Sequence, residues 1–328
     1  MEKESEIEQF RFSAKPMTAA DGTRKLVPLS VGHRGYSAKY AENTLSALQA
    51  AIEDGADAIE TDVHMSSDGF VVISHDPSTK RVFGSNGGLI KKRPYIGDLD
   101  RLLTVCPPHE KMPLLREVLE LFISNANFDD KRLVIDVKAD NEVGIIEGIA
   151  KAMKEIKDDF TFWNSRIVLG IWMIKFLPYC EKYLPQTPMM HIGANIWYAR
   201  KFLEAPTLVG FSILLACLYS TDGYALIRES RAAGKAIYVW TVNPDEAMRM
   251  CLALQVDAVL TDNPVRFDEL RKEYLNRAAD GKVKETEVDP ESAVEKVLTL
   301  GTKTRLYAFG LLMKTISPIL RIMNELPN

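Results

Sequence analysis

The chain has 328 residues, of which 46% are hydrophobic and 26% are charged, an ordinary composition for a folded globular protein. Its formal net charge of -4 gives no electrostatic reason to expect nucleic acid as a partner. The four cysteines are scattered, without Cys-x-x-Cys spacing, which favours buried thiols in a reducing compartment over zinc ligation.

The N-terminal segment, residues 1–26, is polar, and we expect it to form a flexible arm. Its first eight residues are acidic and contain no apolar run, so they do not resemble a secretory signal. An intracellular, cytoplasmic protein is therefore expected.

After this arm, short β-branched runs alternate with longer helical patterns. The expected strands are 26–31, 58–63, 70–74, 133–137, 166–171, 188–192, 208–213, 236–241 and 258–261. The expected helices are 44–53, 113–124, 142–156, 224–233 and 244–254. This alternation predicts a parallel sheet covered by helices, here a (β/α)8 TIM barrel over residues 27–280. The chain lacks the Gly-x-Gly-x-x-Gly pattern of an open dinucleotide-binding sheet.

Nine expected strands exceed the eight positions of such a barrel. The link between 58–63 and 70–74 is too short for a crossover helix, and Asp68-Gly69 is a hairpin signal. We therefore expect these two strands to pair antiparallel. A turn centred between Ser67 and Asp68 would set Glu60 opposite His75.

Residues 77–112 form a glycine- and lysine-rich insertion after the third strand, expected over one mouth of the barrel. A solvated loop is the favoured interpretation of its basic run, Lys91, Lys92 and Arg93. Contact with an anionic surface is the alternative.

Two histidine dyads end separate apolar runs, His33-Arg34 after 28–32 and His75-Asp76 after 70–74. Between them lie Glu60 and Asp62, two residues apart on an expected strand and therefore on one side of it. Imidazoles suit proton transfer near neutral pH, paired carboxylates can share a hard cation, and a guanidinium can grip a phosphate. This grouping indicates metal-assisted phosphoryl chemistry.

These residues belong to a longer ordered series of short motifs. The series is His33-Arg34-Gly35, Glu42-Asn43-Thr44, Glu60-x-Asp62, Asp68-Gly69, His75-Asp76, 113–119, Asp136-x-Lys138, 239–243 and Thr261-Asp262-Asn263-Pro264. In this order and spacing it resembles the glycerophosphodiester phosphodiesterase family. Two longer stretches, 162–172 and 238–244, resemble the fungal phosphatidylglycerol-specific phospholipase C branch of that family.

The resemblance implies a role for each matching position. His33 and His75 would be the acid and base, with their order left open. Arg34, Lys138 and Trp240 would bind the substrate. Glu60, Asp62 and Asp136 would ligate a divalent cation, Mg²⁺ or Ca²⁺. Asp136 stands where the family usually has a glutamate, so a bridging water is an alternative to direct ligation there.

The implied reaction is attack on phosphorus by the glycerol hydroxyl next to the ester carbon, followed by opening of the cyclic phosphate by water. The favoured activity is phospholipase C-type cleavage of phosphatidylglycerol to diacylglycerol and glycerol phosphate. The alternative is hydrolysis of deacylated glycerophosphodiesters to sn-glycerol 3-phosphate and an alcohol. A lyase that stops at the cyclic phosphate and a catalytically silent lipid-binding barrel are the remaining readings.

Residues 281–328 are expected to form a linker and an amphipathic tail. Its apolar stretch, 306–320, is interrupted by Lys314 and Pro318 and is too short to span a bilayer. Because basic residues surround it, we expect peripheral association with an anionic membrane, at a mitochondrial, endoplasmic reticulum or lipid-droplet surface. Packing of this helix on the barrel is the alternative.

Overall fold

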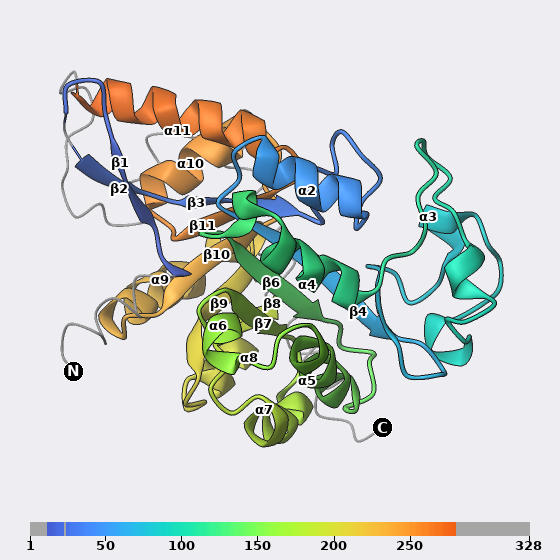
Figure 1. Ribbon diagram of the computed structural model, residues 1–328. Helices are drawn as coiled ribbons and strands as arrows, with labels where there is room; N and C mark the ends of the chain where they lie inside the picture. Colours follow the sequence, from blue (N-terminus) through green and yellow to red (C-terminus); the bar gives the residue numbers. More distant parts are fainter. Residues whose placement is uncertain (1–11, 23, 280–328) are drawn as a thin grey trace. The chain divides into compact units, whose positions relative to one another are not determined.

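The computed structural model describes residues 12–22 and 24–279 of the chain. Figure 1 shows the elements of the described part. This part divides into two compact units. Ser30–Met190 and Leu260–Arg266 form one of them, which we call the site unit. The other described residues form the second unit. The expected tail, residues 281–328, lies outside the described residues.

The sheet confirms the predicted (β/α)8 barrel. Its strand order runs β3-β4-β6-β7-β8-β9-β10-β11 and closes through the pairing of β11 with β3. The strands are β3 (Leu29–His33), β4 (Ala58–Met65), β6 (Arg132–Val137), β7 (Ile167–Ile171), β8 (Met189–Gly193), β9 (Leu208–Leu214), β10 (Ala236–Trp240) and β11 (Ala258–Thr261). These eight strands are parallel, and all but the first follow the expected ranges closely, because buried parallel strands read as continuous β-branched runs. The first expected strand, 26–31, is wrong at its start, since β3 begins only at Leu29, after Pro28.

The helices follow the strands in the expected alternation. The longer ones are α2 (Leu45–Glu53), α4 (Leu115–Ser124), α5 (Ile145–Ile156), α7 (Leu177–Tyr183), α9 (Thr221–Ala232), α10 (Asp245–Leu254) and α11 (Pro264–Ala279). Short α-helices are α3 (Lys80–Phe83), α6 (Phe160–Asn164) and α8 (Ile196–Ala199), and short 3₁₀ helices include η2 (Ile90–Lys92) and η3 (Leu99–Arg101). None of the helices in the described ranges is long and apolar enough to cross a membrane.

The ninth predicted strand forms a hairpin with β4. β5 (Val71–Ile73) pairs antiparallel with β4, as expected, but Val63 lies opposite Ile73, one residue away from the expected register. The loop has three residues, 67–69, closed by the Ser66 N–H to Phe70 O hydrogen bond of 2.9 Å. Gly69 has φ +86°, a conformation that glycine adopts without strain. An odd loop centres the turn on Asp68 rather than between two residues, which shifts the register.

The segment expected as a flexible arm contains a second hairpin, β1 (Lys15–Thr18) with β2 (Arg24–Val27). Val27 and Ala19 are buried against Leu275 of α11, and Met17 packs on the same cluster. Burial of these apolar side chains gives this part of the segment a defined place in the second unit.

Residues 77–112, which we call the insertion lobe, have a small core of their own. Phe83, Ile90 and Leu99 pack there against Val72 and Leu114. Arg93 is only 9% exposed and donates to Asp98 Oδ2 at 2.8 Å, so the expectation of a solvated loop is wrong for this residue. Its neighbours Lys91 and Lys92 are exposed.

Candidate active site

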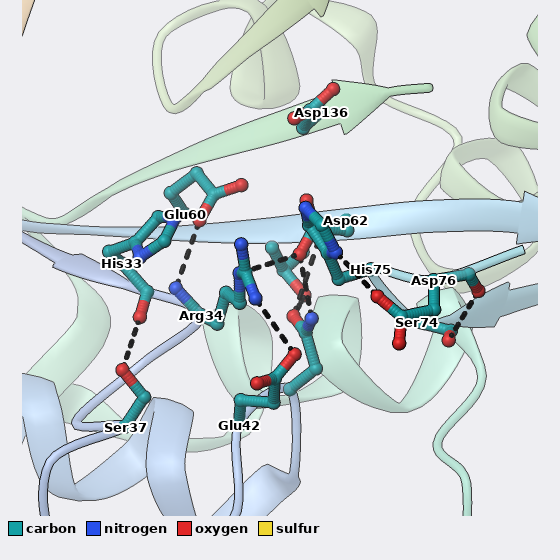
Figure 2. A network of polar contacts seen from close by, with 12 residues as sticks. His33, Arg34, Ser37, Glu42, Glu60, Asp62, Ser74, His75, Asp76 and Asp136 are labelled. Carbon is teal, nitrogen blue, oxygen red and sulfur yellow. Dashed lines mark hydrogen bonds and ion pairs between the residues drawn. The ribbon is translucent and has the colours of Figure 1, made fainter. Parts of the chain in front are cut away.

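The candidate residues gather around the ends of β3 and β6 and the middle of β4 in the site unit (Figure 2). Strand register brings them together: His33 of β3 lies opposite Glu60 of β4, and Asp62 lies opposite Asp136 of β6. Lys138 follows directly after β6. In enzymes with this barrel, catalytic groups come from the carboxyl ends of several strands.

Three carboxylates form an acidic cluster, defined as Glu60, Asp62 and Asp136. Each offers an oxygen atom within 4.8 Å of the others, and all three are buried. The Lys138 ammonium lies 2.6 Å from Asp62 Oδ1 and 2.6 Å from Asp136 Oδ2. Trp172 donates its indole N–H to Asp136 Oδ1 at 2.7 Å. Both oxygens of Asp136 therefore contact polar groups of the site unit.

The three carboxyl groups of this cluster differ in pKa. Burial raises the pKa of Glu60 well above its usual range, and the charges of Asp62 and Asp136 raise it further. Burial also raises the pKa of Asp136 to about 6, although Lys138 opposes the shift. Burial would do the same to Asp62, but Lys138 and Arg34 outweigh it and hold its pKa below the usual range.

A divalent cation fits this arrangement on chemical grounds. The described part of the chain offers three buried carboxylates here against two nearby cationic side chains, Arg34 and Lys138. An added cation would offset the charge excess that raises the pKa of Glu60. Carboxylate oxygens are ligands for hard cations.

Arg34 is fixed by an unusual backbone turn. Arg34 has φ +58°, and its N–H donates to Glu60 Oε2 at 2.9 Å. The following Gly35 also has a positive φ, and a Cβ there would lie 2.4 Å from the carbonyl carbon of Ala47. The guanidinium reaches Glu42 Oε1 at 2.9 Å, and Figure 2 shows it among the acidic side chains.

Asn43 anchors the middle of the cluster, although its motif is equally typical of a helix cap. Its side-chain amide donates to Asp62 Oδ2 at 2.7 Å, and its Oδ1 accepts from Thr61 Oγ1 at 2.8 Å. Thr44 provides the cap of α2 instead, because its hydroxyl oxygen accepts from Ala47 N at 3.2 Å. Asn43 is therefore a site residue.

Each histidine has its own carboxylate partner. His33 Nδ1 lies 2.8 Å from Asp262 Oδ1, and His75 Nδ1 lies 2.8 Å from Asp76 Oδ1. A carboxylate on Nδ1 fixes the tautomer and orientation of an imidazole, so proton transfer would go through Nε2. Burial lowers the pKa of His75, partly opposed by Asp62.

Arg81, a residue of the insertion lobe, connects the two histidine dyads through their carboxylate partners. Its Nε donates to Asp76 Oδ2 at 2.7 Å, and its Nη1 and Nη2 donate to Glu42 oxygens at 2.5 and 2.8 Å. Asp76 holds His75, and Glu42 holds Arg34. The hydrogen bonds from Arg81 are the main cause that lowers the pKa of Asp76 to about 2.

The glycerophosphoryl diester phosphodiesterase family model matches residues 33–266, which is well over half of the chain and includes every site residue described above. The chain belongs to this family. It is a phosphoric diester hydrolase with the family's barrel.

Known members of the family are moderately similar over most of their length. Lysophospholipase D GDPD1 of Mus musculus is 28% identical over 286 residues, which cover 75% of this chain and 85% of the mouse protein. Glycerophosphodiester phosphodiesterase of Bacillus altitudinis is 26% identical over 246 residues, which cover 74% of this chain and 97% of the bacterial protein.

Solved structures of phosphodiesterases share the fold. A glycerophosphodiester phosphodiesterase from Thermotoga maritima superimposes with a TM-score of 0.56 at 30% identity, over 74% of this chain and 98% of that one. A phosphodiesterase from Oleispira antarctica, solved with the product sn-glycerol-3-phosphate, gives a TM-score of 0.61 at 23% identity. The match covers 75% of this chain and 97% of the Oleispira chain.

Of the predicted site residues, the site unit of this phosphodiesterase brings together all but one. Trp240 lies at the end of β10 in the second unit, where its indole donates to Ser212 O at 3.1 Å. Its expected place in the substrate pocket stays a prediction.

Three partners of the site were not predicted to have roles in it. Asp262 and Arg81 reach the histidine dyads, and Trp172 reaches the acidic cluster. Asp262 and Trp172 lie within stretches that resemble the family, which is the one sequence signal for them. For Arg81, nothing beyond its place five residues after Asp76 pointed to the site.

Proposed function

We propose that the chain hydrolyses glycerophosphodiesters, releasing sn-glycerol 3-phosphate and an alcohol. The observation that carries the proposal is a pair of histidines, His33 and His75, on opposite sides of the charged side chains of the site (Figure 2). The Nδ1 atom of each histidine lies 2.8 Å from an aspartate oxygen. Arg34 lies between them and carries a fixed positive charge for a phosphodiester. This activity is the alternative drawn from the sequence, and the names of the relatives support it better than cleavage of phosphatidylglycerol.

In the proposed reaction, the phosphate binds to Arg34 and Lys138. The Lys138 ammonium has three N–H donors, and its two carboxylate partners leave a donor for a phosphate oxygen. One histidine removes the proton from the glycerol hydroxyl next to the ester carbon, and that oxygen attacks phosphorus within the same molecule. The other histidine protonates the departing alcohol oxygen.

Water then opens the cyclic phosphate while the two histidines exchange roles. A divalent cation held by Glu60, Asp62 and Asp136 would draw charge from the phosphate oxygens. We propose Mg²⁺ or Ca²⁺, since the three protein ligands are all carboxylates. A cyclic phosphate that accumulates without being opened would identify the chain as a lyase.

A second candidate is phospholipase C-type cleavage of phosphatidylglycerol. Its support is the resemblance of 162–172 in sequence to the fungal branch of the family; Trp172 of this stretch contacts Asp136. The two candidate functions use the same catalytic groups and differ only in the substrate that binds to them.

The decisive experiment offers the purified full chain, with Mg²⁺ or Ca²⁺, two substrates in parallel. Glycerophosphocholine in solution should yield sn-glycerol 3-phosphate and choline, identified by phosphorus NMR and mass spectrometry. Diacylglycerol from phosphatidylglycerol micelles alone would favour the second candidate. Turnover of neither substrate with any metal would favour a silent lipid-binding barrel.

We further propose a domain of residues 27–280 and a membrane-associating tail, residues 281–328, in a cytoplasmic peripheral membrane protein. The support is the basic and interrupted apolar composition of 303–321. Deletion of 295–328 should weaken co-sedimentation with anionic liposomes, and unchanged binding would contradict this role of the tail.

A further inference from the structure

The insertion lobe differs in charge from the rest of the chain. It has seven basic residues, Lys80, Arg81, Lys91, Lys92, Arg93, Arg101 and Lys111, and three acidic ones, Asp98, Asp100 and Glu110. Its net charge is therefore +4, although the whole chain carries -4. Part of this charge is paired, since Arg93 is buried against Asp98 and Arg81 binds Glu42 and Asp76 outside the lobe. The exposed cations Lys80, Lys92, Arg101 and Lys111 can attract anionic partners.

The lobe also exposes apolar side chains. Half of the large exposed hydrophobic side chains in the described residues belong to it: Leu89, Ile96, Leu103 and Val105. Their exposed fractions range from 37% to 66%. The lobe's own core is formed by other side chains, including Phe83, Ile90 and Leu99. These four are therefore not needed to hold the lobe together.

Two of the four share one side of an extended segment. Leu103 is 48% exposed, Thr104 is 2% exposed and Val105 is 53% exposed, which is the alternation of an extended chain with one side in solvent. Leu103 forms a bridge with Lys111, which is also exposed. Val105 donates its N–H to Val82 O and so lies against α3.

The other exposed apolar residues also have basic neighbours. Leu89 comes directly before η2, whose Lys91 and Lys92 are exposed. Lys91 lies 3.6 Å from Glu142, a residue that is itself exposed. Ile96 is followed by Gly97, and the Arg101 guanidinium lies close to that glycine: a Cβ added to Gly97 would be 3.9 Å from Arg101 Nη2.

We propose that the insertion lobe docks on an anionic phospholipid surface. Leucine, isoleucine and valine beside lysine and arginine suit the boundary between lipid headgroups and acyl chains. There the apolar groups enter the boundary and the cationic ends stay with the phosphates. The lobe is joined to the site through Arg81, whose ion pairs hold Asp76 and Glu42. The docked lobe therefore holds the site close to the headgroups.

The chain carries a suitable attachment point for a reporter. Cys106 is exposed and follows Val105 in the lobe, whereas Cys180, Cys217 and Cys251 are buried. An environment-sensitive fluorophore on Cys106 of the full chain should gain emission with phosphatidylcholine vesicles that contain phosphatidylglycerol. Doxyl-labelled lipid should quench this emission, and pure phosphatidylcholine vesicles should give little response.

Two variants and a control make the test specific to the lobe. Leu103→Asp with Val105→Asp should abolish the gain, and Lys91→Glu with Lys92→Glu should weaken vesicle binding about 10-fold or more. Turnover of glycerophosphocholine should persist in both variants, which shows that they fold. The control label is placed by Ile123→Cys in a Cys106→Ser background, because Ile123 is 48% exposed on α4, outside the lobe.

An unchanged Cys106 signal on vesicles overturns the proposal, whether or not the protein co-sediments, since binding through the tail alone gives that result. An equal response of the control label overturns it as well. The proposal requires only binding, so either failure would leave the proposed phosphodiesterase activity intact.

Discussion

The acidic cluster and the two histidine dyads are adjacent, but different parts of the fold build them. The cluster is buried on β4 and β6, with side-chain exposures of 1% for Asp62 and 6% for Asp136. The dyads lie where strands pass into loops. The His75 and Asp76 side chains are 35% and 25% exposed, and those of His33 and Arg34 are 11% and 17% exposed. One half of the site is therefore inside the fold and the other is at its edge.

This difference in burial predicts that substitutions in the two parts of the site have different effects, one mainly on folding stability and the other mainly on catalysis. Buried charges depend on one another, so loss of one cationic partner leaves a carboxylate unpaired in the interior. Partly exposed histidine–carboxylate pairs remain solvated when one member is removed. We expect changes in the cluster to alter folding and changes in the dyads to alter rate.

The largest expected effect is on catalysis by the dyads. His33→Ala and His75→Ala should each lower kcat about 10²- to 10⁴-fold, because each removes an acid or base. Thermal unfolding should change little in the His75 variant, whose side chain is 35% exposed, and more in the His33 variant, whose side chain is 11% exposed. His109→Ala, a change of an exposed histidine outside the site, is the control and should retain activity. A fully active His33 or His75 variant would exclude that histidine from the reaction.

The second prediction concerns the acidic cluster. Lys138→Met removes the cation that contacts both Asp62 and Asp136. It should lower the free energy of unfolding by about 3 kcal/mol or more in metal-free buffer, measured by urea denaturation. A divalent cation should restore part of the loss by replacing the missing charge. Stability unchanged from the native protein would contradict the division between the two halves of the site.

The two halves should also respond oppositely to pH. Burial raises the pKa of Asp136 to about 6, so metal-free stability contributed by this group falls as pH rises from about 4 through 6. Hydrogen bonds from Arg81 lower the pKa of Asp76 to about 2, so its contribution falls as pH drops from about 4 to 2.

A bound cation competes with protons for the cluster, so its stabilising effect should grow between pH 5 and 7.5, roughly as cation affinity rises. At one hundred times its Kd, the cation should raise the Tm by roughly 5 °C relative to EDTA-treated protein. Differential scanning fluorimetry across this range measures the effect. A cation effect independent of pH would count against ligation by Asp136 and Glu60.

The smallest effect is expected at Arg81, whose side chain is 49% exposed. Arg81→Ala should lower kcat about 10-fold with a stability change below about 1 kcal/mol. Without Arg81 the carboxylate of Asp76 should stabilise protonated His75 more strongly, which should move the acid limb of the kcat profile to higher pH. Arg81→Lys should recover part of both effects, and Lys80→Ala is the neighbouring control. An unshifted acid limb would limit Arg81 to a structural role.

The sequence predicts the strands and the residues at their ends, because both depend on local patterns. Glu60 and Asp62 are two apart on a strand, so their common side follows from chain geometry alone. The partners of these residues come from distant segments. Asp262 is 229 positions from His33, and Trp172 is 36 positions from Asp136.

Loops account for the other differences between prediction and structure. The turn between β4 and β5 has three residues, whereas the expected turn had an even number. The register of β5 against β4 therefore differs from the expected one by one residue. Arg93 resembles its exposed neighbours in sequence, but it is buried because Asp98 and Thr79 fold back to receive its guanidinium. Neither outcome can be deduced from residue type, since each depends on how the chain closes on itself.

The contact between Trp172 and Asp136 has a practical consequence. Its indole N–H points at an oxygen of the acidic cluster, and its ring lies 5.6 Å from the Lys138 ammonium. Indole emission responds to nearby charge, so the protein contains a native optical sensor of whatever occupies the cluster. The chain has only four tryptophans. Replacement of Trp163, Trp197 and Trp240 by phenylalanine would leave a single emitter, which would allow cation binding to be titrated without added dye.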